Sequence, residues 1–100
     1  MKKDIELINI EFNTLAQRHY FSVCDRLEKA SAGFSHWQHE TEYLQMHAMY
    51  WDLLRINLET EALTLIEQHK NAQDIHLLQK ALTIHINRYL NEFKVKYRLI

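Results

Sequence analysis

The residues best suited to chemistry in this chain lie together in "QMHAMYWDLLRIN", residues 45–57. Histidine and methionine can serve as axial ligands of haem iron, and aromatic rings line many cofactor pockets. At about 100° per residue, however, Met46 and Met49 lie on one side of a helix, whereas His47 and Trp51 lie on another. We therefore interpret this stretch as packed helix and predict no cofactor.

Seven histidines in the chain prompt a search for metal ligands. His39 and Glu40 follow His36 by three and four residues, a spacing with which one helical face can present ligands. A chain that folds back at Gly33 adds only Glu28 as a further acidic ligand, beside two competing cations. We expect a solvent-exposed first helical turn here rather than a metal site.

Two other histidines, His19 and His47, lie fourteen residues on either side of Gly33. A helical hairpin that folds at this glycine would bring them level with each other. Two imidazoles supply only half of a zinc site, so the prediction is a hydrogen-bonded interior pair. Such a pair resists protonation, and its charging would loosen the hairpin, which makes it a candidate pH-sensitive element.

Nucleophilic catalysis is not indicated. Cys24 lies in the middle of a predicted helix rather than at a helix N-terminus, and is interpreted as a small buried hydrophobe. The sequence contains no phosphate-binding glycine loop, no nucleophile elbow and no H-E-x-x-H motif. We expect no enzymatic activity.

The stretch "NRYLNEFKVKYRLI", residues 87–100, alternates basic and aromatic side chains. Its cations Arg88, Lys94, Lys96 and Arg98 could contact a phosphate backbone, so nucleic-acid binding is the main alternative function. Cations at the C-terminal end of a helix also interact favourably with the helix dipole, which explains part of the same pattern without a ligand.

The composition predicts one cytoplasmic globular domain, residues 1–100. With 47% hydrophobic and 25% charged residues and a net charge of -1, the chain as a whole has no electrostatic preference for nucleic acid or anionic lipid. Cys24 is alone, which excludes an internal disulfide and suits a reducing compartment. No apolar run resembles a signal peptide or a membrane span, so no membrane partner is expected.

Long helices are favoured because the chain has no proline and only one glycine. Gly33 suits the end of a first helix, Ser35 and Gln38 form a capping box for a second, and Asp74 suits the start of a third. The expected helices cover residues of about 4–31, 36–70 and 75–97. A break near Asn57 would divide the second helix and give four.

The second helix differs from its neighbours because it carries two apolar stripes at helical spacing. The first stripe comprises Leu44, His47, Trp51, Leu54, Leu58 and Leu65. The second stripe comprises Met46, Met49, Leu53, Ile56, Thr60 and Leu63, in alternating steps of three and four. Residues 36–70 carry six acidic and two basic side chains, and residues 71–100 carry two acidic and five basic ones, which favours antiparallel packing of these segments.

These patterns predict an all-α, coiled-coil-like bundle of three long antiparallel helices. We predict a homodimer with the second stripe at its centre, and a protein partner of unknown identity; the alternative is that the flanking helices cover both stripes. We expect a non-enzymatic protein-binding module, such as an adaptor, an antagonist or an assembly chaperone. The predicted interface residues are Met46, Met49, Tyr50, Leu53 and Ile56, because methionine and tyrosine suit adaptable apolar surfaces.

Overall fold

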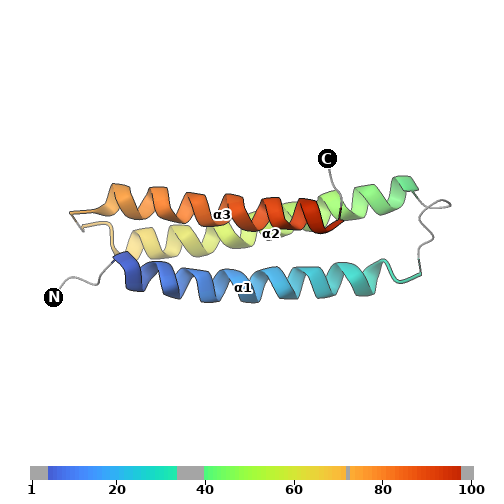
Figure 1. Ribbon diagram of the computed structural model, residues 1–100, viewed down its shortest axis with the longest axis horizontal. Coiled ribbons are helices and arrows are strands. Elements are labelled where there is room, and N and C mark those ends of the chain that lie inside the picture. The colour runs from blue at the N-terminus through green and yellow to red at the C-terminus, as the bar shows by residue number, and fades with distance from the viewer. Residues whose placement is uncertain (1–4, 34–39, 72, 98–100) are drawn as a thin grey trace.

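The computed structural model describes residues 5–33, 40–71 and 73–97. These residues form three helices, α1 (Ile5–Ala30), α2 (Glu40–Gln68) and α3 (Ile75–Tyr97). Figure 1 shows the helices side by side along one long axis, in a molecule that measures 57 × 21 × 17 Å. Each helix packs against both of the others. The predicted all-α bundle of three helices is confirmed.

The chain reverses direction between consecutive helices, as the colours of Figure 1 show. His19 of α1 lies 3.0 Å from Glu61 of α2, and further along α1 the Arg26 guanidinium lies 5.8 Å from the ring centre of Tyr50. Residue numbers therefore rise along α1 as they fall along the facing side of α2. These contacts also set the axial register between the two helices.

Polar contacts connect α1 to α3 at two levels. Asn13 Oδ1 accepts hydrogen bonds from Tyr89 Oη at 2.6 Å and from Arg88 at 2.9 Å. Near the other end, Tyr97 Oη donates to Glu28 at 3.2 Å. Residue numbers rise in the same direction along both helices, so α1 and α3 run alongside each other in parallel.

Both ends of α1 and α3 and the C-terminal end of α2 agree with the expected ends to within two residues, whereas the expected start of α2 at residue 36, with its capping box of Ser35 and Gln38, lies outside the described residues. α1 ends at Ala30, where the backbone amide and the hydroxyl of Ser31 both donate to the carbonyl of Leu27. Gly33 does not adopt the left-handed conformation predicted for it, so the glycine cap is not present. α2 is continuous through Asn57, which excludes the four-helix alternative.

The core runs along the centre of the bundle and receives side chains from all three helices. Its members are Ile8, Phe12, Ala16, Val23, Cys24, Leu27, Leu54, Leu58, Ala62, Leu65, Leu78, Leu82, Ile86, Tyr89, Leu90 and Phe93. The sequence predicts one apolar stripe on the first helix, formed by Ile5, Ile8, Phe12, Leu15, His19, Val23 and Leu27, and four of these residues are in the core, together with three of the first stripe of α2. The hydrophobic effect of this burial holds the helices together, since most helical stability in proteins comes from the packing of an apolar face.

Candidate interaction surface

Five of the six members of the first stripe of α2 are directed toward the core, and Leu44, near the start of the helix, is 49% exposed. His47, Leu54, Leu58 and Leu65 are buried, and Trp51 is half-buried with its indole donating to the carbonyl of Leu90 at 3.3 Å. At about 100° per residue, the second stripe falls on roughly the opposite side of the helix. Met49, Ile56, Thr60 and Leu63 of the second stripe are thus directed away from α1 and α3, whereas Met46 and Leu53 also pack partly against the core.

The second stripe is exposed along most of its length. Met49, Ile56 and Leu63 are spaced seven residues apart and have exposed fractions of 59%, 46% and 66%. This exposure excludes the alternative in which α1 and α3 cover both stripes. A contiguous apolar strip on the surface of a folded domain is typical of an interface.

The five predicted interface residues differ in exposure. Met49 and Ile56 are exposed, whereas Met46, Tyr50 and Leu53 are half-buried and pack partly against the core. The latter three therefore border the surface rather than form its centre. Leu63 is more exposed than Met49 or Ile56 and was missing from the predicted interface, although its seven-residue spacing from Ile56 was visible in the sequence.

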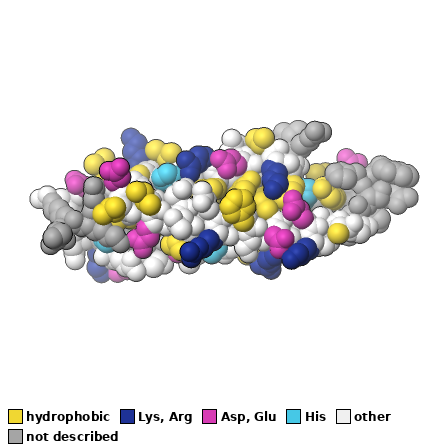
Figure 2. Space-filling view, turned by 60° about the horizontal axis from the view of Figure 1, so that its bottom comes forward, with side chains coloured by type: hydrophobic (Ala, Val, Ile, Leu, Met, Phe, Trp, Pro, Cys, Tyr) yellow, Lys and Arg dark blue, Asp and Glu magenta, His cyan; other side chains and the backbone are white. Residues whose placement is uncertain are grey.

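The outer surfaces of α1 and α3 also carry apolar side chains, but charged and amide residues interrupt them, whereas only Thr60 interrupts the second stripe. α1 exposes Leu7, Ile10 and Phe21, and α3 exposes Leu77, Ile84 and Val95. Polar residues interrupt both sets, for example Gln17 on α1 and Lys80 on α3. Figure 2 brings the α1 side forward and shows apolar side chains there separated by charged ones. Single exposed apolar side chains of this kind are ordinary.

One flank of the second stripe is acidic and internally paired. Arg55 donates to Asp52 at 2.6 and 3.0 Å and to Glu59 at 3.1 and 3.2 Å. These hydrogen bonds raise the pKa of the Arg55 guanidinium. Both carboxylates therefore already have a cation within their own helix.

The other flank, nearer to α1, carries Asn57 and Thr64 and no charge at these positions. Thr64 Oγ1 donates to the carbonyl of Thr60, and Thr60 Oγ1 donates to the carbonyl of Ile56. These hydroxyl protons are satisfied within α2. The two flanks of the second stripe thus differ in charge, and this difference bears on what the stripe can bind.

The structure does not bring His19 and His47 together, contrary to the prediction. His19 contacts Glu61, which is fourteen residues, or about 21 Å of helix, from His47. His47 instead packs against the rings of Tyr43 and Tyr97, with centroids 4.0 and 5.0 Å away. The register differs because α1 and α2 are not symmetric about Gly33. The interior histidine pair predicted from the sequence is therefore not present.

The candidate metal ligands cannot be assessed as a set, because His36 and His39 lie outside the described residues. Glu40 is the exposed first residue of α2, where a negative charge favours the helix N-terminus. Within residues 5–33, 40–71 and 73–97, no group of three or more histidine, cysteine or acidic side chains is arranged to hold a metal ion.

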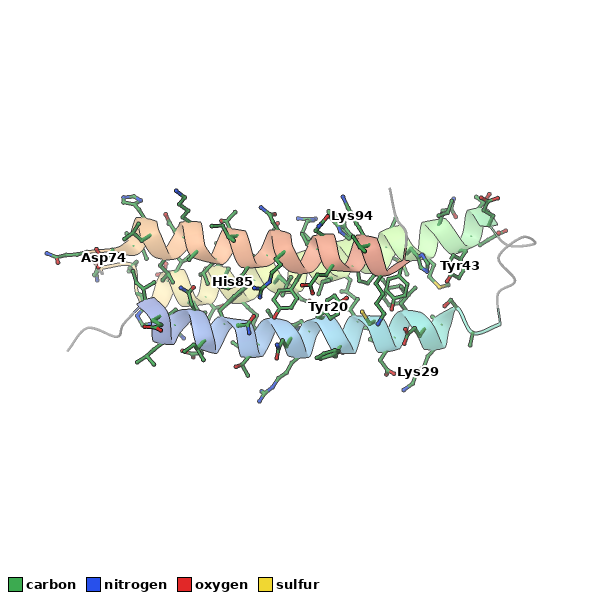
Figure 3. All side chains as sticks on the ribbon, viewed as in Figure 1. Tyr20, Lys29, Tyr43, Asp74, His85 and Lys94 are labelled. Carbon is green, nitrogen blue, oxygen red and sulfur yellow. The ribbon has the colours of Figure 1, made fainter. Side chains whose placement is uncertain are left out.

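The basic side chains of α3 do not form one patch. Arg88 bonds to Asn13, and Lys96 lies 3.7 Å from Glu28, so both are directed toward α1. The ammonium of Lys94 lies 4.9 Å from the ring centre of Trp51 on α2, and Figure 3 shows Lys94 on the side of α3 away from α1. Arg98 lies outside the described residues.

A shallow groove between α1 and α3 collects polar groups. It is lined by Ile5, Glu6, Asn9, Ile10, Asn13, Thr14, His85 and Arg88. Figure 3 shows His85 directed into the space between the two helices, where its ring lies 6.2 Å from that of Phe12. Burial first, and the charge of Arg88 second, lower the pKa of His85 below 6.5.

We expect this groove to make folding pH-dependent. The unfolded chain protonates His85 near its ordinary pKa of about 6.5, whereas the folded chain resists protonation. The contribution of neutral His85 to the free energy of unfolding is therefore fully present above about pH 6.5. It decreases as the pH falls from there toward the lowered pKa of His85 in the folded chain. A comparison of wild type with His85→Gln isolates this effect, because Glu6 and Arg88, which share the groove, are present in both proteins. In thermal denaturation between pH 7.5 and 5.5, wild type should lose more stability than the variant, and parallel pH profiles would contradict the assignment.

Comparison of the chain with protein-family models, with curated proteins and with solved structures gave no match. None of the described helices combines the length and apolar character that crossing a membrane requires.

Proposed function

We propose that this chain is a non-enzymatic protein-binding module that acts through the second stripe of α2. The observation that carries the proposal is the exposure of Met49, Ile56 and Leu63 in one line on the side of α2 opposite the core. Burying these side chains against a partner removes apolar area from water, at about 25 cal/mol per Å². The spacing of the second stripe also predicted a homodimer from the sequence.

Nucleic-acid binding receives less support. A phosphate backbone is held by cations that lie along one surface, whereas Arg88 and Lys96 are directed toward α1 and Lys94 toward α2.

We also propose a cytoplasmic location, because the lone Cys24 is buried and excludes an internal disulfide.

Ile56→Asp is expected to weaken binding and leave the fold intact. Ile56 lies near the middle of the stripe with an exposed fraction of 46%, so the free chain tolerates a charge there, whereas an interface does not. In a symmetric dimer the change occurs twice, and the dissociation constant should rise more than about a hundredfold, equivalent to about 3 kcal/mol. Leu53→Asp is a poorer choice because Leu53 also packs against the core.

The measurement is solution mass by light scattering on a size-exclusion column over a tenfold concentration range, with a parallel pull-down from a lysate of the native organism. Ile84→Asp is the matched control, because Ile84 is 60% exposed on the outer side of α3. Wild type and the control should behave alike, and Ile56→Asp should lose self-association or capture. If all three proteins have the same mass and capture the same proteins, the second stripe is an ordinary surface and the proposal is wrong.

A further inference from the structure

We infer that the second stripe binds the same stripe of a second copy of this chain, with the two α2 helices parallel and in register. The inference rests on the proposed function and adds the partner and its orientation. Parallel helices related by a two-fold axis place identical residues opposite each other. The steps of three and four along the stripe are those with which two helices pack as a coiled coil.

The stripe maps directly onto heptad positions. Position a is taken by Met46, Leu53 and Thr60, and position d by Met49, Ile56 and Leu63. Glu42 and Glu67 fall on the same line of the helix and are exposed. A carboxylate is costly to bury between helices, so these two residues set the ends of the contact.

The charge on the flanks distinguishes the two orientations. Asp52 and Glu59 lie at position g, and Asn57 and Thr64 lie at position e. In an antiparallel pair g faces g, so Asp52 meets Glu59 of the second copy twice over, and like charges repel. In a parallel pair g faces e, and the carboxylates meet the uncharged amide and hydroxyl instead. Flanking charges at these positions are known to set orientation in coiled coils.

Thr60 favours the same orientation. In a parallel pair Thr60 faces Thr60 of the second copy, so one polar layer forms. In an antiparallel pair centred on the stripe, Thr60 faces Met49, and two mixed layers form. Because the hydroxyl proton already bonds to the carbonyl of Ile56 at 2.8 Å, a threonine layer leaves no donor unsatisfied.

The acidic flank does not require a basic partner, which favours a second copy over a foreign helix. Asp52 and Glu59 are both hydrogen-bonded to Arg55 within α2, so a neutral flank can approach them without leaving two unpaired carboxylates. The net charge of the chain is only -1, so two copies repel each other weakly at long range. A basic amphipathic helix is the competing occupant and is one outcome of the test below.

Cysteine cross-linking tests the orientation. Met49 and Thr60 are both exposed, and we would prepare Met49→Cys and Thr60→Cys, oxidise each alone and then an equimolar mixture. Parallel packing brings each cysteine opposite its own copy, whereas residues 49 and 60 stay about 16 Å apart along the axis, beyond disulfide reach. Wild type controls for Cys24, which is buried, and Ile84→Cys controls for collisions at an equally exposed position.

Each cysteine variant alone should form covalent dimers at least about tenfold faster than Ile84→Cys, because the interface raises the effective thiol concentration. The mixture should give no dimer that contains both variants. If only the mixture cross-links, the pair is antiparallel and the inference is overturned, while the proposed function stands. If no sample exceeds the control but capture still depends on Ile56, the occupant is a different protein and the inference is again overturned. If neither cross-linking nor capture depends on the stripe, both proposals fail.

Discussion

Leu58→Asp is expected to leave this protein largely unfolded at 25 °C. The Leu58 side chain is 0% exposed, and it belongs to the core to which all three helices contribute. A carboxylate there must lose its hydration or take up a proton, at a cost of at least about 4 kcal/mol. Total stabilities of domains are about 5–15 kcal/mol, so one such change removes a large fraction.

The matched control is Leu63→Asp, the same substitution on the same helix at a side chain that is 66% exposed. We expect this variant to keep its helical circular dichroism and to lose only self-association. For Leu58→Asp the melting temperature should fall by roughly 20 °C or more, if a cooperative transition is seen at all. Equal losses of helicity in the two variants would mean that the second stripe is buried as deeply as the first.

Phe12→Ala should produce the second largest loss of stability. Phe12 is 0% exposed, and its ring lies at the α1–α3 contact near that of His85. Truncation removes the buried ring and leaves a cavity that the neighbouring helices fill only in part. Losses of about 3–5 kcal/mol are typical of such substitutions.

Urea denaturation measures this difference directly. Phe21→Ala provides the control, because Phe21 lies on the same helix and is 65% exposed. Its free energy of unfolding should stay within about 0.5 kcal/mol of wild type, with the same dependence on urea. A loss at Phe21 as large as that at Phe12 would show that the outer face of α1 is also buried, for instance in a larger assembly.

Much of the local structure followed from the sequence. The absence of proline and the single glycine favoured long helices, and Asp74 marked the start of α3 at Ile75 as expected. The two stripes of α2 were visible from spacing alone, because side chains three and four residues apart share a helical face whatever surrounds them. The same geometry predicted that Met46 and Met49 lie on a different side of α2 from His47.

What the sequence could not decide was how the helices lie against one another. Spacing showed two stripes on α2, but only packing determined that Leu54 and Leu58 are buried while Ile56 and Leu63 are exposed. The axial register was also undetermined, since it depends on contacts between residues distant in sequence. The hairpin symmetry assumed around Gly33 therefore paired His19 with His47, whereas the structure pairs His19 with Glu61.

The basic end of α3 illustrates the same limit. In the sequence Arg88, Lys94 and Lys96 form one cluster, but their helical angles direct them to different sides, and α1 and α2 supply separate partners for them. Helical periodicity is a property of one segment, so the sequence by itself determined the elements and their apolar faces. The rotation of each helix about its axis, and the axial register between helices, depend on which side chains of the three helices pack together. Only the tertiary structure fixes these contacts, because they join residues that are distant in the sequence.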